Sequence, residues 1–257
     1  MIAARVRRGA VGLAVTIAGL EAFTRSGPVD PASLPPPSIV LATAARMLVD
    51  VEFLTALGGT LAAWVGGLTL ATAISVPLGL VLGSSRRSYR AGIAAVELLR
   101  PIPSVALIPL AILLLGRGLD MKVILIAYAS AWPILFNTIY GIRDVDPVTR
   151  ETGRTFGLGA VAVLTTISLR SASPFIYTGI RISAAIALIL AISTELIAGG
   201  GPGLGTWMLE NSGAGVPREL LYGAIVVTGL LGLAINTALV LGERRLFAWH
   251  HRVRAET

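Results

Sequence analysis

Long apolar segments constrain the fold of this chain more than any other feature of its sequence. Of the 257 residues, 54% are hydrophobic and only 14% are charged, which departs strongly from the composition of soluble domains. A run of about 20 apolar residues crosses the hydrocarbon core of a bilayer as a helix. We therefore predict an all-α, multi-pass membrane protein.

Six segments of the chain qualify as membrane spans. One of them contains Pro101, Pro103 and Pro109, which predict a broken helix. Pro77 lies inside the longest apolar run and predicts a tilted or kinked helix there. The other five expected spans are residues 9–23, 53–83, 121–142, 175–198 and 220–241.

Residues 1–52 form the predicted N-terminal unit. Its first apolar segment is short enough for a secretory signal peptide, but we favour an uncleaved span because no small-x-small cleavage site follows it. Ser38 is expected to cap an outer interfacial helix, since Arg46, Asp50 and Glu52 are too polar for a span. A core domain, 53–241, and a basic cytoplasmic tail, 242–257, follow.

The basic residues are distributed unevenly. The chain has 21 Lys and Arg and 14 Asp and Glu, a net charge of +7 that would suggest a nucleic-acid partner in a soluble protein. Most of the basic residues lie near the chain ends, in the 84–92 turn or in the 143–181 section, all on one side of the predicted membrane. The positive-inside rule makes that side cytoplasmic and places both termini there. We therefore expect no nucleic-acid partner.

One long polar insert, residues 146–173, interrupts the apolar pattern. Asp146 is a predicted N-cap and is followed by a proline at the first helical position. Gly157 stands where a left-handed C-cap is needed, and Gly159 lets a second helix, 160–169, leave at an angle. The pattern predicts a helix-turn-helix that docks another protein, or else a helical loop without a partner. Its apex carries Phe156 and Leu158.

The order of residues in this insert resembles the EAA loop of bacterial ABC-importer permeases. The matching residues are Glu151, Gly157, Ile167, Leu169 and Pro174. In that family the loop forms a coupling helix that sits in a groove of the ATP-hydrolysing subunit. The resemblance therefore implies that the ATPase docks on Glu151, Gly153, Thr155, Phe156, Gly157, Leu158 and Gly159.

Two residues depart from the family pattern. Gly153 is the third residue of the motif and weakens the first helix by roughly 1 kcal/mol relative to alanine. Arg170 replaces a usual proline and leaves the second helix free to run further. Residues 34–41 and 98–113 are also similar to segments of the nitrate, sulfonate and taurine branch of these permeases. The resemblance implies the type I ABC importer permease fold.

The chain has few side chains that could catalyse a reaction or bind a nucleotide or metal without a partner protein. It has no cysteine, and no phosphate-binding loop pattern precedes its single lysine, Lys122. We therefore expect no catalytic residue, cofactor or metal on this chain. His250 and His251 are interpreted as solvated tail residues, and the glycine-rich segment 199–205 as a flexible outer loop that touches a delivery protein or gate.

Polar residues inside the spans are the candidates for the transport pathway or its gate. A carboxylate at Glu195 is costly unless it faces protein or a wet cavity. We predict that it faces the pathway or a subunit contact, with a hydrogen-bonded structural carboxylate as an equal alternative. Arg100 is a further candidate, although we favour an ion pair with Glu97. Weaker candidates are Asn137 and Ser193.

The expected function is that of a non-catalytic permease subunit of an ATP-driven importer. The resemblance implies a second permease copy in a homodimer, two ABC ATPase subunits that use ATP and Mg, and an extracytoplasmic substrate-binding protein. It also implies a place among the lipids of the bacterial inner membrane. The first substrate expectation is a small organic anion such as a sulfonate, taurine or a nitrate-like solute.

A self-sufficient ion-coupled transporter or channel is the alternative function. Such a protein needs acidic relays inside the membrane or an inverted repeat. Apart from Glu21 at the exit of the first segment, only Glu97 and Glu195 are acids within the predicted spans, and no inverted repeat is evident.

Overall fold

The computed structural model describes residues 2–27, 30 and 33–247, and their regular elements are all helices. His250 and His251 lie outside this described part. The elements, in chain order, are α1 (Ile2–Arg25), α2 (Pro37–Met47), α3 (Val51–Ser84), α4 (Arg86–Leu99), the 3-10 helix η1 (Ser104–Leu107), α5 (Ile108–Leu115), α6 (Leu119–Arg143), α7 (Pro147–Thr155), α8 (Ala160–Ala162), the π-helical η2 (Val163–Ser168), α9 (Leu169–Ala198), α10 (Leu204–Glu210) and α11 (Arg218–Leu246).

Within the described part of the chain, four helices are long and apolar enough to cross a membrane: α3, α6, α11 and the continuous helix Ala160–Ala198. A fifth span is formed if α4 and the segment Ser104–Leu115 are counted together, although they meet at a bend of 73°. That bend confirms the predicted break at the prolines. The 24-residue α1 does not meet the same criterion. By this criterion the described residues contain four spans, or five with the bent pair, and do not confirm the predicted six.

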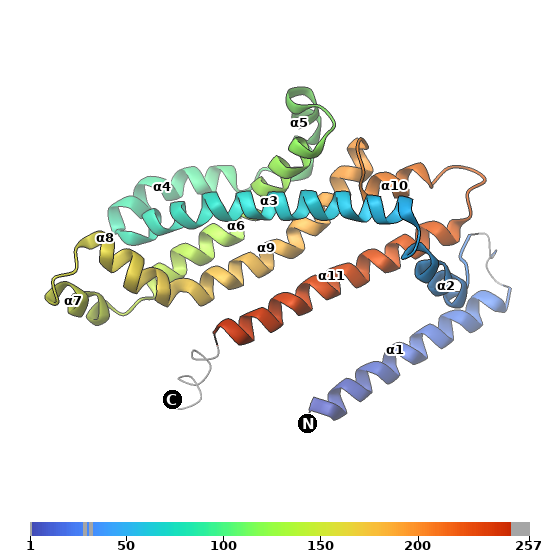
Figure 1. Ribbon diagram of the computed structural model, residues 1–257, viewed down its shortest axis with the longest axis horizontal. Helices are drawn as coiled ribbons and strands as arrows, with labels where there is room; N and C mark the ends of the chain where they lie inside the picture. The colour runs from blue at the N-terminus through green and yellow to red at the C-terminus, as the bar shows by residue number, and fades with distance from the viewer. Residues whose placement is uncertain (1, 28–29, 31–32, 248–257) are drawn as a thin grey trace.

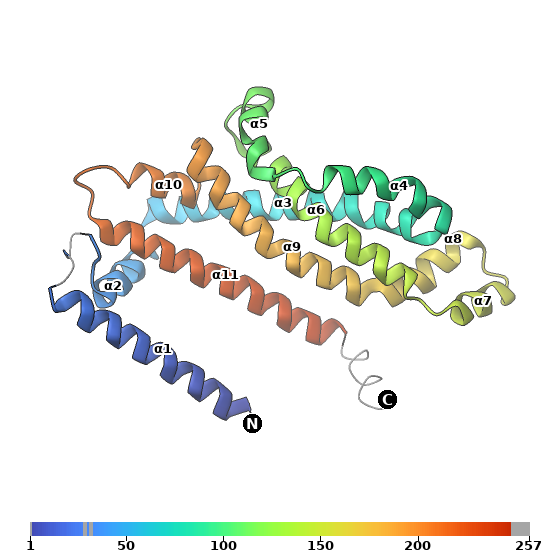
Figure 2. The ribbon, with the colours of Figure 1, turned by 180° about the vertical axis from the view of Figure 1, so that it is seen from behind.

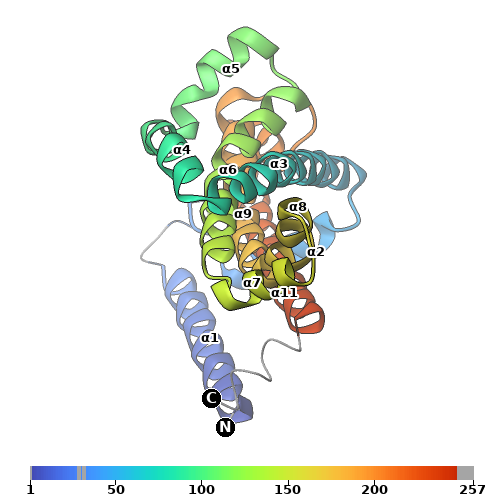
Figure 3. The same ribbon diagram turned by 90° about the vertical axis from the view of Figure 1, so that its left-hand side faces the viewer.

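The core of the molecule is built from α3, α6 and α9. In Figures 1 and 2, α3 runs beside α6, and α6 runs beside α9. Helix α11 packs against α2 and α9. Figure 3, seen from the α7 end, shows α4 and α5 on one side of this bundle and α1 set apart on another. The polar helix α7 lies at one end of the molecule and α10 near the other.

Small residues let α3 approach α6 closely. They recur at every fourth position along one buried face of α3, which carries Gly67, Ala71, Ser75, Gly79 and Gly83. A Cβ atom added at Gly67 would lie 2.4 Å from Cγ2 of Ile126, and one added at Gly79 would lie 2.6 Å from Cβ of Thr138. Close approach through small residues is a main source of helix association in membranes, where burying apolar surface gives little gain.

The beginnings of three helices differ from the prediction. Ser38 does not cap α2, which starts at Pro37; its hydroxyl instead bonds to the Glu21 carboxylate of α1. Helix α3 begins at Val51 because the Asp50 carboxylate accepts the backbone N–H of Phe53 at 2.8 Å. The predicted basic turn is largely the first turns of α4, since the Ser85 hydroxyl caps that helix.

Adding a methyl group to Gly67 tests the close approach of α3 and α6. We expect Gly67→Ala to lower the free energy of unfolding by about 1–3 kcal/mol, because the new methyl meets the stiff, β-branched Ile126. Gly58→Ala is the matched control on the same helix, where nothing lies within 4 Å of the new atom. The control should be neutral or stabilising by up to about 1 kcal/mol. Thermal unfolding of the purified protein in detergent measures both, and equal shifts would contradict this packing.

Candidate functional site

The polar insert folds at its beginning as its sequence predicts. Asp146 caps α7 by accepting the backbone N–H of Val148 at 2.9 Å, and Pro147 is the first residue of the helix. The helix ends at Thr155, and Gly157 follows in the left-handed conformation with φ of +84°. The N–H of Leu158 then reaches back to the carbonyl oxygen of Gly153 at 3.1 Å. This bond closes the turn that the sequence requires a glycine to make.

The apex of this turn exposes apolar side chains. Phe156 is 83% exposed and Leu158 is 38% exposed. A shallow apolar groove of about 400 Å³ runs beside them. Its lining residues are Val148, Thr149, Thr152, Gly153, Phe156, Leu158 and Ile167. Three other residues of the predicted docking set, Glu151, Thr155 and Gly159, are also exposed.

Gly153 is the buried member of the predicted docking set. A Cβ atom at this position would lie 2.5 Å from Cδ1 of Ile167. The glycine therefore lets α7 pack against η2 more closely than a larger residue would. The sequence suggests only its cost in helix propensity, whereas the structure shows this packing role.

The segment after the turn is longer than predicted. The second helix does not end at residue 169, and no new span begins at residue 175, because one hydrogen-bonded helix runs through Ala160–Ala198. Figures 1 and 2 show that it changes direction between α8 and α9, around the π-helical η2. A π-helical turn is a common cause of such bends. Arg170 allows the continuation, as its departure from the family pattern predicts.

Glu195 lies at the other end of this long helix and is fully buried, with 0% of its surface exposed. Its Oε1 atom forms an ion pair with Nζ of Lys122 at 3.1 Å. Its Oε2 atom accepts the hydroxyl of Thr60 at 2.8 Å and the backbone N–H of Gly205 at 3.0 Å. The carboxylate thus joins α3, α6, α9 and α10. These contacts match the hydrogen-bonded structural carboxylate that the sequence left open as the alternative.

The glycine-rich segment is fastened to the same cluster. Lys122 donates a second bond to the carbonyl oxygen of Pro202 at 3.1 Å, and the hydroxyl of Thr60 accepts the N–H of Leu204 at 2.8 Å. Gly203 has no room for a side chain, since a Cβ atom there would lie 2.3 Å from the Glu195 carboxyl carbon. The last two residues of the segment, Leu204 and Gly205, begin α10 rather than belonging to the flexible loop of the prediction.

Sequence reasoning missed the roles of Lys122 and Thr60. A signal was present, because a lone lysine and an acid inside two different apolar spans are costly unless they pair. Thr60 lies one turn after Ala56 on α3, and nothing in its neighbours along the chain indicates a carboxylate partner.

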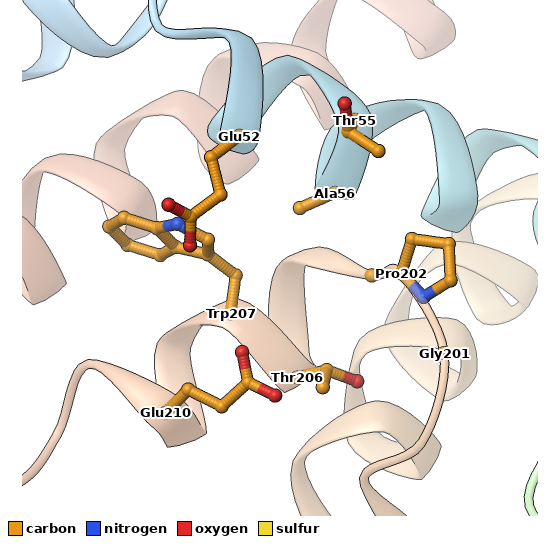
Figure 4. Close-up of a pocket in the computed structure, with 9 residues that line it drawn as sticks. Glu52, Thr55, Ala56, Gly201, Pro202, Thr206, Trp207 and Glu210 are labelled. Atoms are coloured by element: carbon orange, nitrogen blue, oxygen red, sulfur yellow. The ribbon is translucent and has the colours of Figure 1, made fainter.

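A pocket of about 360 Å³ opens beside α10 (Figure 4). Figure 4 shows Glu52 at the start of α3 and Glu210 at the end of α10, with Trp207 beside Glu52. Thr206 and the 201–203 segment complete most of the lining. The Thr206 hydroxyl is buried and has no hydrogen-bond partner among the described residues. This end of the molecule therefore presents acidic side chains around the glycine-rich segment.

The remaining candidate residues do not meet in one site. Asn137 is half-buried in α6 and donates to the carbonyl oxygen of Pro133 at 2.8 Å, while Ser193 is half-buried in α9. Arg100 does not pair with Glu97 in the described structure. Its guanidinium lies 5.0 Å from the centre of the Phe136 ring, which is cation–π geometry. A ring from a neighbouring helix thus replaces the predicted pairing along the chain.

Comparison with known proteins places this arrangement in a family. Residues 75–247 match the family model described as binding-protein-dependent transport system inner membrane component. A putative ABC transporter permease of Methanocaldococcus jannaschii is 30% identical over 191 residues, covering 74% of this chain and 71% of the relative. The taurine transport system permease of Escherichia coli is 28% identical, covering 88% and 83%.

A solved structure supports the same fold. The chain superimposes on a chain of the inward-facing MetNI methionine ABC transporter with a TM-score of 0.66 and 18% identity, covering 77% of this chain and 97% of the other. The family match runs from the C-terminal part of α3 to the end of α11. This chain therefore belongs to the family of inner membrane components of binding-protein-dependent transport systems.

Proposed function

We propose that this chain is the permease subunit of an ATP-driven ABC importer and that a separate ATPase docks on residues 151–159. The exposed apex at Phe156 and the apolar groove beside it are the observations that carry this proposal. An exposed aromatic side chain beside a groove, on a helix too short to span, is typical of a protein-docking surface. ATP and Mg would bind to the ATPase, so this chain would transmit motion without catalysing hydrolysis.

The proposed topology has six spans and two cytoplasmic termini. Helix α1, with 24 residues, would be the first span, and the bent pair α4 and Ser104–Leu115 the third. The described ends of α1 and α11 point toward the α7 end of the molecule in Figure 1. This arrangement supports a common cytoplasmic side for the termini and the docking loop. The end that carries α10 would then face the substrate-binding protein.

The proposed assembly contains two copies of this chain, two ATPase subunits and one substrate-binding protein. The pathway would form between the two permease copies, and we propose a small organic anion as its cargo. Relatives named for taurine, aliphatic sulfonates and nitrate support that class, whereas one relative is named for choline. Uptake assays should therefore include taurine, nitrate and choline as competing solutes.

Substitutions at the turn test the docking proposal. We expect Gly157→Val to abolish transport and weaken co-purification of the ATPase, because a side chain at positive φ costs about 1–2 kcal/mol and re-aims Phe156. Glu151→Arg should also abolish transport and weaken co-purification of the ATPase, because it reverses a charge on the exposed face of α7. Both variants should insert at near-normal levels. Transport in vesicles and recovery of the ATPase on the tagged permease measure these effects, with Val161→Ala as an exposed control outside the docking set.

A single cysteine tests which side the turn faces. The chain has no native cysteine, so Leu158→Cys provides a unique thiol at the apex. The thiol should crosslink to the ATPase subunit in the purified complex. Labelling of this thiol by impermeant reagents outside intact cells would contradict the topology, and ATP hydrolysis by the permease alone would contradict its role.

The buried ion pair provides a separate prediction for the outer end. Lys122→Met should destabilise the protein by about 3–5 kcal/mol, because it leaves the Glu195 carboxylate buried without its cation. Glu195→Gln combined with Lys122→Met should recover part of that loss. Glu195→Gln alone should also lower stability, because it leaves the Lys122 ammonium buried without its anion, and should change transport or its coupling to ATP hydrolysis in the complex that still assembles. Thermal unfolding and vesicle transport separate these effects, and additive losses in the double variant would exclude coupling between the two side chains.

A further inference from the structure

A second pocket, of about 280 Å³, lies at the base of the docking turn. It forms where the ends of α3 and α6 meet α7 and the start of the helix Ala160–Ala198. Two arginines line it, and no carboxylate does. The lining residues are Ser84, Ile142, Arg150, Arg154, Ala160, Val161, Val163, Leu164 and Ser168.

The two arginines form an uncompensated positive cluster. They are four residues apart and therefore share one face of α7. Arg150 donates to the backbone carbonyl of Ile142, but its Nε–H is buried and has no partner in the described structure. Burial lowers the pKa of Arg150, and the positive charge of Arg154 lowers it further. The three ion pairs among the described residues involve neither side chain.

Other groups around the pocket also favour negative charge. Ser168, a buried residue with a hydroxyl that can donate a hydrogen bond, is in the lining. The helix Ala160–Ala198 begins at the pocket with Gly159, which offers no side-chain cap. Its first backbone N–H groups and the positive end of its dipole therefore add to the field of the two guanidinium groups.

The position of the pocket identifies the kind of anion. Ser84 is the last residue of α3, and Ile142 is the second-to-last residue of α6. The pocket therefore lies where two spans end. Lipid phosphates lie just outside the hydrocarbon core, the region in which spans end. We propose that the pocket binds the phosphate group of an anionic lipid, held by Arg150 and Arg154. A guanidinium fork matches phosphate oxygens, and basic pockets beside spans are sites for anionic headgroups.

A bound phosphate would connect the docking turn to the membrane domain. It would join α7, through its two arginines, to the helix start at residue 160, beside the ends of α3 and α6. The inference concerns binding by this chain alone and does not depend on the proposed ATPase partner.

Lipid retention by the purified full-length protein tests this inference. In detergent with added dioleoylphosphatidylglycerol, native mass spectrometry should show one retained lipid on the wild type. Arg154→Gln should weaken retention about tenfold, because it removes a charge-assisted contact. Arg154→Glu should abolish retention, because its carboxylate would occupy the phosphate position beside Arg150. Arg170→Gln, an exposed arginine near the same end and outside the lining, is the matched control and should retain the lipid.

Two further measurements distinguish the sources of the anion. Dioleoylphosphatidylcholine should be retained more weakly than phosphatidylglycerol, because its ammonium group would face the arginines. If millimolar inorganic phosphate raises the unfolding temperature of the wild type but not of Arg154→Gln, while phosphatidylglycerol is not retained, the lipid assignment is overturned. Equal retention by all variants would also overturn it. Arg154 is exposed, so its substitution should leave the fold intact, and an unchanged unfolding temperature verifies this.

Discussion

Close contact between α3 and its neighbours holds the described structure together. Lipid chains are as apolar as leucine, so helices in a membrane gain little from burying apolar surface against each other. They associate when their backbones come close enough for dense packing. The small residues of α3, such as Gly67 and Gly79, give α6 that access along its length. The positions of α4, α9 and α10 follow, because each of them packs on α3 or α6.

Local patterns in the sequence predicted local structure well. The Asp146 cap, the positive φ of Gly157 and the break at the prolines depend on a few adjacent residues, and all are confirmed. Contacts between distant segments were predicted poorly. The Lys122–Glu195 pair joins residues 73 positions apart, and Arg100 faces a ring on α6 rather than an acid on its own helix. The periodicity of apolar residues predicts which side of a helix is buried. It does not identify the helix or side chain that packs against that side.

The two ends of the bundle differ in how their charges are compensated. At the α10 end, the carboxylate of Glu195 has a cation and two hydrogen-bond donors, all supplied by this chain. At the α7 end, Arg150 and Arg154 form no ion pair with a carboxylate among the described residues. The contacts of Glu195 hold α3, α6, α9 and α10 of this chain together. The two arginines remain able to bind an anion that is not part of this chain, in a region where helices leave the membrane.

The continuity of α9 gives it the mechanical properties of a lever. Its 30 residues form a rod of about 45 Å, with the π-helical bend at one end and Glu195 in the last turn of the other. A tilt of about 5° about the bend would move the far end by about 4 Å. Hydrogen bonds of 2.8–3.1 Å at Glu195 cannot stretch that far. Such a tilt would therefore transmit a rotation from the docking turn to the opposite end of the molecule only by breaking the contacts of Glu195 or by carrying α3, α6 and α10 along with α9.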